Sequence, residues 1–332
     1  MSAVAPITIG MPIYNAERYL EESLESLLGQ TCGDFELIIS DNGSSDRTEE
    51  ICRQYAADDS RITYIQHDRN RGAVWNFNHV FERSRSPFFK WASYDDVCRP
   101  TFLEACYEPI QSDDDIAWVH PLTNHLSEDG IVQSGSDDPE VPSGRDSHSL
   151  LSDATLKSDY SRQSLHPRDR FAAVVLGTTW CSDSYGLMRA AAVKRTRLYL
   201  PCYGAEKVLL AELSLVGRFA EVEEPLFLQR VHDAASGSLT SASAQAKFIA
   251  PSAARRFSST RFTLLHGFAT AIKRSDLGLS TKVGCYRVLG QYMFQVRKWS
   301  RVLSQMAGGR GMALPKAAKG QRTTDVLQTT SS

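Results

Sequence analysis

The first 120 residues alternate between short apolar runs and segments whose apolar residues recur three or four positions apart. We expect strands at Ile7–Pro12, Phe35–Ser40, Ile62–Gln66, Phe88–Ser93 and Ile116–His120. One intervening segment opens with Asp46 and Glu49, the spacing of a helix-capping pair. Strands that alternate with helices predict an α/β fold, with a Rossmann-like, mostly parallel sheet covered by helices on both faces.

Polar clusters follow three of the predicted strands: Tyr14-Asn15, Asp41-Asn42 and Asp95-Asp96. In such sheets the carboxyl ends of the strands form the ligand-binding edge, so we expect these clusters to lie together. Acidic doublets occur elsewhere in the chain, but only Asp95-Asp96 directly follows a buried strand. Carboxylate oxygens are suitable ligands for Mg²⁺ or Mn²⁺, which makes this pair the candidate metal site.

The second part of the chain is less regular. Residues 134–167 are polar and rich in Ser and Asp, which predicts a long surface loop. The remaining expected elements are a helix near Arg168–Leu176, a strand at Tyr185–Arg189, a helix that opens at Glu206, and two strands near Phe219–Val222 and Leu226–Val231. After Gly237 the pattern is helical.

Four motifs in chain order resemble glycosyltransferase family 2. They are Ile9-Gly10-Met11-Pro12-Ile13-Tyr14-Asn15, Asp41-Asn42-Gly43-Ser44, Asn70-Arg71-Gly72 and Tyr94-Asp95-Asp96. The resemblance is strong over about residues 5–120 and visible through about residue 240. It implies a GT-A fold, a nucleotide-sugar as donor substrate, Mg²⁺ or Mn²⁺ as cofactor, and inversion of the anomeric centre.

The resemblance also implies roles for single residues. Tyr14 is similar to the aromatic residue that stacks on the base, and Asp41 to the acid that accepts a hydrogen bond from that base. Asp95 is similar to the acid near the ribose and metal, and Asp96 to the metal ligand. The family's second motif usually has two acids, so Asn42 marks a lost carboxylate. The donor site is expected to include four further residues, Pro12, Asn15, Asn70 and Gly72.

The catalytic base is expected at the start of the helix that opens with Ala205-Glu206-Lys207, where the family usually has Glu-Asp. An inverting transfer needs one carboxylate to take the proton of the acceptor hydroxyl. Glu206 is the candidate base; alternatively, Glu206 fills the neighbouring position and Lys207 has displaced the base. Asp183 is the fallback, and a helix-terminal glutamate stabilised by the helix dipole is the structural alternative.

Arg230-Val231-His232 resembles an Arg-x-His segment that closes over the diphosphate in the family. Arginine can pair with phosphate and histidine can ligate a metal, so we expect Arg230 at the donor and His232 at the metal. A purely structural role for His232 is the alternative.

Charge is unevenly distributed. Residues 247–322 contain 15 Lys and Arg and one acid, whereas residues 1–246 contain 22 basic and 37 acidic residues. Between Val283 and Met306 a helical face carries Tyr286, Leu289, Met293, Val296, Trp299 and Leu303, with Arg287, Arg297, Lys298 and Arg301 near or opposite it. Such a helix either lies on an anionic membrane surface or packs on the acidic catalytic part of the chain. No recognition motif favours nucleic acid.

These patterns predict a GT-A domain over residues 1–240, with nucleotide-sugar binding in 1–120 and the acceptor side in 120–240. A basic helical extension over 241–306 and a disordered tail over 307–332 follow. No apolar run is long enough to cross a bilayer, and the start lacks a secretory signal, so we expect a cytoplasmic enzyme, free or peripheral at the inner face of the cell membrane.

The expected function is transfer of a sugar to a glycan, a lipid-linked or another hydroxyl acceptor in envelope polysaccharide or glycoconjugate synthesis. Two alternatives are a sugar nucleotidyltransferase, which needs a glycine-rich phosphate loop absent after the first strand, and a catalytically degenerate nucleotide-sugar-binding scaffold.

Overall fold

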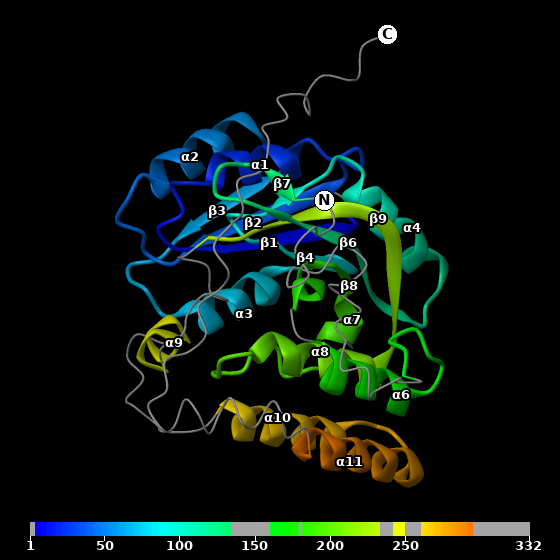
Figure 1. Ribbon diagram of the computed structural model, residues 1–332. Coiled ribbons are helices and arrows are strands. Elements are labelled where there is room, and N and C mark those ends of the chain that lie inside the picture. Colours follow the sequence, from blue (N-terminus) through cyan, green and yellow to red (C-terminus); the bar gives the residue numbers. More distant parts are fainter. Residues whose placement is uncertain (1–3, 134–159, 179–180, 233–241, 250–259, 295–332) are drawn as a thin grey trace.

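The computed structural model describes residues 4–133, 160–178, 181–232, 242–249 and 260–294. Its strands form one mixed sheet in the order β3-β2-β1-β4-β8-β6-β9-β5, with β7 paired to β6 (Figure 1). The strands are β1 (Ile7–Ile13), β2 (Phe35–Asp41), β3 (Ile62–Gln66), β4 (Phe88–Trp91), β5 (Val97–Cys98), β6 (Ile116–Leu126), β7 (Val132–Gln133), β8 (Leu187–Arg189) and β9 (Arg218–Arg230).

The helices of the first part are α1 (Leu20–Leu28), α2 (Thr48–Asp58), α3 (Ala73–Arg83) and α4 (Phe102–Ser112). The second part has α6 (Pro167–Ala172), the π-helical turn η1 (Ala173–Gly177), the 3₁₀ turn η2 (Ser182–Tyr185), α7 (Ala190–Val193) and α8 (Ala205–Val216). The last three are α9 (Ala242–Ile249), α10 (Thr260–Arg274) and α11 (Leu279–Met293). None of the described helices is long and apolar enough to span a bilayer.

The first four strands are parallel, as predicted. Alternate residues of β1, from Ile7 to Ile13, join α1, α2 and α4 in one buried apolar cluster. On the other face, Ile38 of β2 and Trp91 of β4 join a second cluster with α3 and the helices of the second part. A strand buried on both faces needs apolar residues at nearly every position, which explains the unbroken apolar runs.

The predicted α/β fold is confirmed, but beyond β4 the sheet is mixed, because only β6 and β9 of these later pairings are parallel. β8 lies antiparallel between β4 and β6, and β5 lies antiparallel to β9. The two strands predicted near Phe219 and Leu226 are one long strand, β9. Its charged segment Glu223-Glu224-Pro225 suggests a turn, yet it stays extended across a register irregularity in the pairing with β6.

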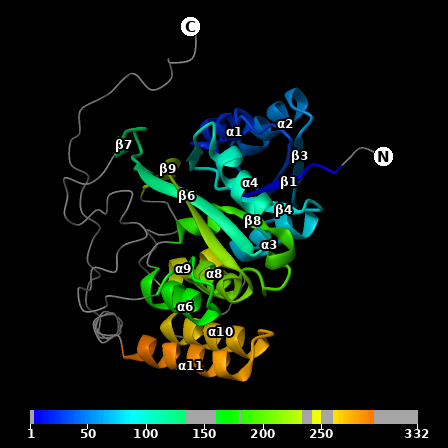
Figure 2. The ribbon, with the colours of Figure 1, turned by 90° about the vertical axis from the view of Figure 1, so that its right-hand side faces the viewer.

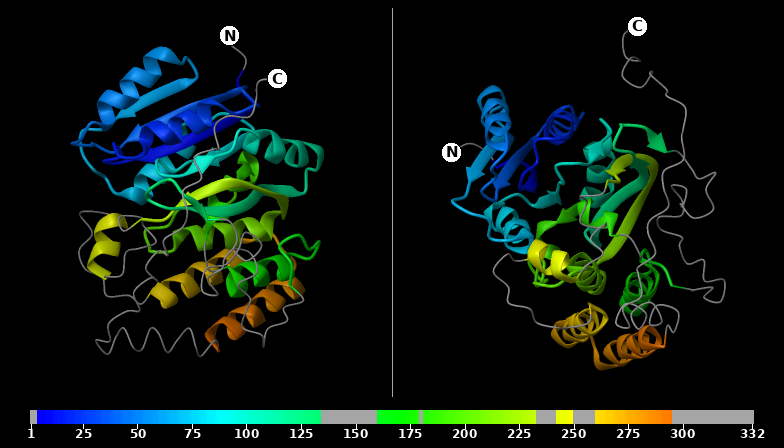
Figure 3. Two further views of the ribbon diagram at one scale, coloured as in Figure 1. Left: turned by 45° about the horizontal axis from the view of Figure 1, so that its top comes forward. Right: turned by 60° about the vertical axis from the view of Figure 1, so that its left-hand side comes forward.

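The C-terminal helices form an outer layer on the second part of the fold (Figures 2 and 3). Phe268 and Ile272 of α10 are fully buried in the cluster that also holds Val208 of α8. Gly267 permits this packing, because a Cβ there would lie 2.9 Å from Val208 Cγ2. The predicted tail over 307–332 and most of the predicted loop over 134–167 lie outside the described residues.

The predicted apolar face of the last helix is wrong at Leu289. Leu289 is 6% exposed and packs inward with Cys285 and Val288, whereas Tyr286 and Met293 face outward. The rest of the predicted face, from Val296 onward, lies outside the described residues.

Candidate active site

The loops after β1 and β2 are tied to each other by hydrogen bonds. Asn15 N donates to Ser44 Oγ at 2.9 Å, and Ser45 N donates to Asn15 Oδ1 at 2.9 Å. Asn15 has a positive φ of 50°, a conformation that asparagine tolerates better than most residues. Tyr14, at the end of β1, is 43% exposed, so its ring is available to a ligand at this edge.

Pro12 is buried within β1, opposite Ser40 of β2. Its lack of an N–H fits its place, because the pairing of β1 with β4 extends only to Gly10 and Trp91. Pro12 therefore shapes the end of β1 and has no side-chain polar group to offer a ligand.

Asp41 ends β2 with its side chain buried. Oδ1 accepts from Ser44 N at 2.9 Å and from Ser44 Oγ at 2.6 Å, and Oδ2 accepts from Tyr64 Oη at 2.7 Å. The half-buried phenol of Tyr64 beside this carboxylate has a raised pKa, through burial first and then through Asp41, so Tyr64 stays a donor. Because Oδ1 already accepts two hydrogen bonds and Oδ2 accepts one, Asp41 retains acceptor capacity for a base at Oδ2.

Asn42 connects this edge to the turn before α3. Its Nδ2 donates to Asn70 Oδ1 at 3.0 Å and to Gly72 O at 3.2 Å, and its Oδ1 accepts from Arg71 N at 2.9 Å. Gly72 N in turn donates to Asn70 Oδ1 at 2.8 Å, and Gly72 has φ +92°. The Asn42 amide therefore holds the turn before α3 through both its donor and its acceptor atoms. From the sequence alone, Asn42 indicates only a lost carboxylate.

The acidic pair follows β4 and is buried, with Asp95 9% and Asp96 6% exposed. Asp95 accepts hydrogen bonds from Ser93 Oγ and faces His232 Nε2, 2.8 Å from its Oδ2. Asp96 Oδ1 accepts from Arg230 N at 2.9 Å. Burial, and next the neighbouring Asp95, raise the pKa of Asp96 well above its usual value, so the site favours a cation that would offset this charge.

Arg230 braces the pair from β9. Its Nε donates to Asp95 O at 2.8 Å, Nη1 to Ser127 O at 3.1 Å and Nη2 to Glu22 Oε2 at 2.5 Å. The guanidinium also lies 4.4 Å from the centre of the Tyr19 ring. The sequence predicts that Arg230 pairs with diphosphate, whereas in this structure its donors are directed to protein acceptors.

Lys90 is a buried cation near the acidic pair. The sequence does not predict it as a site residue. It is 1% exposed in the middle of β4, and its Nζ donates to Trp91 O at 3.1 Å and to Tyr185 O at 2.8 Å. Its charge opposes the rise in the pKa of Asp96. A lysine inside the apolar run Phe88-Phe89-Lys90-Trp91 is the signal that could have revealed it.

Glu206 is the second residue of α8. The pKa of the Tyr185 phenol is raised well above its usual value by burial first, and then by Tyr199, Asp96, Asp95 and Glu206. Glu206 Oε2 is buried and has no hydrogen-bond partner among the described residues. Burial raises the pKa of Glu206. Lys207 donates from Nζ to Thr178 O at 2.7 Å.

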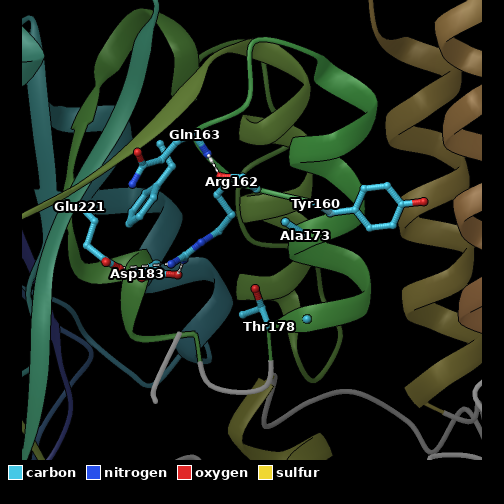
Figure 4. Close-up of a pocket in the computed structure, with 10 residues that line it drawn as sticks. Tyr160, Arg162, Gln163, Ala173, Thr178, Asp183 and Glu221 are labelled. Carbon is cyan, nitrogen blue, oxygen red and sulfur yellow. Dashed lines mark hydrogen bonds and ion pairs between the residues drawn. The ribbon is translucent and has the colours of Figure 1, made fainter. Parts of the chain in front are cut away.

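Asp183 is engaged differently. It is 2% exposed and forms an ion pair with Arg162, which also lies 3.6 Å from Glu221 Oε2. These residues line a pocket of about 200 Å³ between β9 and the α6–η1 segment, together with Thr178 (Figure 4). Figure 4 shows the Arg162 side chain directed toward Asp183 and Glu221. A carboxylate held by a guanidinium is a weaker proton acceptor than an unpaired one.

The first part of the chain is similar in sequence to a known protein family. The model of the family described as "Glycosyl transferase family 2" matches residues 8–152, a stretch that contains all four donor-side motifs. The match covers less than half of this chain, and it ends before the second part of the fold begins.

Individual relatives match the same part of the chain. Glycosyltransferase GlyG of Streptococcus pneumoniae is 28% identical over 124 residues, which are 37% of this chain and 41% of GlyG. The putative glycosyltransferase EpsE of Bacillus subtilis is 37% identical over 105 residues, which are 31% of this chain and 38% of EpsE. The matched regions span less than half the length of these curated relatives.

Solved structures extend the likeness to nearly the whole fold. S. aureus TarS 1–349 in complex with UDP has a TM-score of 0.59 and 16% identity, over 92% of this chain and 75% of that one. S. aureus TarS 1–349 in complex with UDP-GlcNAc has a TM-score of 0.59 and 18% identity, over 90% of this chain and 74% of that one. The chain therefore has the GT-A fold, including the second half and the C-terminal helices.

The residues around Asp95 and Asp96 determine whether the expected Mg²⁺ or Mn²⁺ could bind there. Within the described ranges, no three His, Cys, Asp or Glu side chains are arranged as a ready-made metal site. The two buried carboxylates nevertheless supply hard oxygen ligands, and the raised pKa of Asp96 reflects negative charge that a cation would compensate. His232 Nε2 faces Asp95 Oδ2. The pair fits Mg²⁺ or Mn²⁺ as part of a ligand set that the diphosphate would complete.

Proposed function

We propose that this chain is an inverting glycosyltransferase that moves a sugar from a nucleoside-diphosphate sugar to a hydroxyl of a glycan or lipid-linked acceptor in envelope polysaccharide or glycoconjugate synthesis. One observation carries the proposal: the buried acidic pair and Glu206, whose buried Oε2 has no hydrogen-bond partner among the described residues, all raise the pKa of the same phenol, Tyr185. Such a pair of unlike acidic sites suits donor binding on one side and proton removal on the other.

The donor would bind along the edge formed by β1, β2 and β4. Tyr14 would stack on the base, Asp41 would accept a base N–H, and the loop clamped by Asn42, Asn70 and Gly72 would shape the pocket. The TarS complexes with UDP and UDP-GlcNAc, which share this fold, support a nucleotide-sugar as the donor class.

Asp95 and Asp96 would hold Mg²⁺ or Mn²⁺, and a bound divalent ion offsets the charge that develops on the departing diphosphate. Arg230 holds the pair in place, because its backbone N–H donates to the Asp96 carboxylate and its Nε donates to the backbone carbonyl of Asp95, while the charge of Lys90 opposes the rise in the pKa of Asp96. His232 would fix the orientation of Asp95 through the contact between its Nε2 and Oδ2.

Glu206 would act as the base. The acceptor oxygen attacks the anomeric carbon, the bond from that carbon to the diphosphate oxygen breaks, and the hydroxyl proton passes to Glu206. A carboxylate whose pKa is raised by burial is a stronger base than an exposed one, which suits this step. Asp183 is a poorer candidate because Arg162 already occupies its carboxylate.

The pocket lined by Arg162, Asp183 and Glu221 would receive a neighbouring part of the acceptor. It adjoins the site through Thr178, whose carbonyl accepts the Lys207 hydrogen bond next to Glu206. Its charged and hydroxyl groups suit the hydroxyl groups of a glycan. An anionic membrane surface is a further proposed partner, since lipid-linked acceptors lie there and the C-terminal sequence is basic.

A thermal-shift screen tests the donor assignment. Nucleoside diphosphates and nucleotide-sugars are added with and without Mn²⁺, because a ligand that binds only the folded chain raises its melting temperature. We expect a response that needs Mn²⁺ and is lost in Asp96→Ala. Donor hydrolysis by the parent chain but not by this variant would separate an enzyme from a binding scaffold, and no response to any nucleotide would overturn the proposal.

A further inference from the structure

Helix α11 presents two apolar faces, and only one of them packs on other residues that the structure describes. The inward face consists of Cys285, Val288, Leu289 and Tyr292, all buried against α6, η1 and α10. The outward face consists of five residues, Leu279, Val283, Tyr286, Met293 and Phe294. Leu279 is 79% and Phe294 81% exposed, although both are large apolar side chains. A packed helix normally turns polar residues outward, so this second face needs a separate explanation.

The outward residues form one continuous stripe. At about 100° per residue, the five residues fall within an arc of about 100°, and Gly290 lies in the same arc. Lys282 flanks the stripe on one side and Arg287 on the other. Figures 1 and 2 show α11 at the outer surface of the molecule, on the far side of α10 from α8.

The charges beside this stripe are mainly positive. Lys273 and Arg274 at the end of α10 are exposed, and Lys282 and Arg287 add two cations on α11. The acid in this hairpin, Asp276, is paired with Arg195 at 3.0 Å. The sequence that follows α11 has further basic residues and no acid before Asp325.

We propose that the outward stripe of α11 docks the enzyme on an anionic lipid bilayer. Apolar residues with aromatic rings, flanked by cations, are the composition of a helix that lies in the membrane interface. An acidic headgroup layer complements the cations on both sides of the stripe, whereas a second copy of this chain would bring like charges together. The bilayer is therefore the occupant that the charges favour.

The docking face is rigidly connected to the proposed acceptor side. Arg197, which forms an ion pair with Glu212 of α8, also donates from Nη2 to Gly267 O of α10 at 2.7 Å. A bilayer under α11 would thus be held at a fixed distance from α8, which carries Glu206 in its first turn. The inference rests on the proposed function only in this respect, that the acceptor would be lipid-linked.

Co-sedimentation of the full chain with vesicles tests the proposal. We expect binding to vesicles of phosphatidylcholine with phosphatidylglycerol, weak binding to phosphatidylcholine alone, and loss of binding as salt is raised. Arg287→Gln should weaken binding about fivefold, the effect of one interfacial cation. The double variant Tyr286→Ser/Phe294→Ser should weaken it more, because both rings leave the interface.

Matched controls separate the stripe from general charge or hydrophobicity. Arg85→Gln removes an exposed arginine from the segment between α3 and β4, and Phe262→Ser removes a ring that is 54% exposed on α10. Both should bind vesicles like the parent chain. All variants change exposed side chains, and their melting temperatures verify that they fold.

Equal vesicle binding by the parent and by the Tyr286/Phe294 double variant would overturn the proposal, and so would binding that ignores lipid charge. A concentration-dependent dimer that the double variant abolishes would assign the stripe to a second copy instead. If the chain binds vesicles but no nucleotide raises its melting temperature, docking stands and the proposed transferase function is refuted. If a nucleotide raises the melting temperature but the chain does not bind vesicles, the transferase proposal stands and docking is refuted.

Discussion

Replacing Glu206 with glutamine gives a direct test of its proposed role, because the change removes the charge and keeps the shape. Glu206 Oε2 is buried without a hydrogen-bond partner in the described part of the chain, and burial raises the pKa of the group. Ionised Glu206 therefore destabilises the fold. Its folded pKa lies above its unfolded value of about 4.3, so wild-type stability falls as pH rises from there through the folded pKa.

Glu206→Gln carries no ionisable group at this position, so its folding stability should not fall with pH for this reason. The variant should have no advantage near pH 4 and should gain over the parent chain as pH rises, by about 1.4 kcal/mol for each unit of pKa elevation. Thermal unfolding between pH 4 and pH 8 measures the difference. Catalysis should change in the opposite direction, with sugar transfer about 10²–10⁴-fold slower while nucleotide binding is unchanged.

Asp183→Asn is the matched control. It leaves Arg162 without its buried partner, so it should lose about 3–5 kcal/mol near neutral pH, where Glu206→Gln gains. A stability difference for Glu206→Gln that is the same at every pH would refute the argument from burial. Unchanged transfer in Glu206→Gln would refute its role as the base.

Four further changes test features of the fold and of the loop after β2. Lys90→Met leaves two buried carbonyls without their donor and should cost about 1–3 kcal/mol for each in urea unfolding. Gly43→Ala should cost about 1–2 kcal/mol, since φ is +76° and the new Cβ would lie 2.9 Å from neighbouring backbone, and it should reduce the thermal shift given by UDP. Gly267→Ala should lower the melting temperature through collision with Val208, whereas Gly290→Ala, with open space around it, should raise stability by up to about 1 kcal/mol.

The donor half was predictable because its signals are local. A strand buried on both faces requires an unbroken apolar run, and the polar residue that ends the run marks the ligand edge. The segments from Ile7 to Gln66 accordingly match the observed strands to within one residue. The acidic pair was placed in the same way, by its position after β4.

The second half was less predictable because its structure depends on contacts far apart in the chain. Antiparallel β8 has three residues and is held between β4 and β6, which no local pattern specifies. Arg230 illustrates the same limit at the site, because its identity suggests a phosphate ligand while its partners include Glu22, more than 200 residues away. From the sequence alone, Asn42 predicts a missing acid. Its role in the structure depends on a contact with Asn70 in the turn before α3, which no local pattern specifies.

The apolar cluster shared by the donor half and the C-terminal helices limits how this protein can be divided or recombined. Trp91 of β4, Val208 of α8 and Phe268 of α10 belong to one continuous core. The family match ends at residue 152, yet a fragment cut there would expose apolar surface that α6, α8 and α10 normally cover. A chimaera that takes only the matched segment would need a new complementary surface, so donor specificity can be exchanged between relatives only if this shared core is exchanged with it.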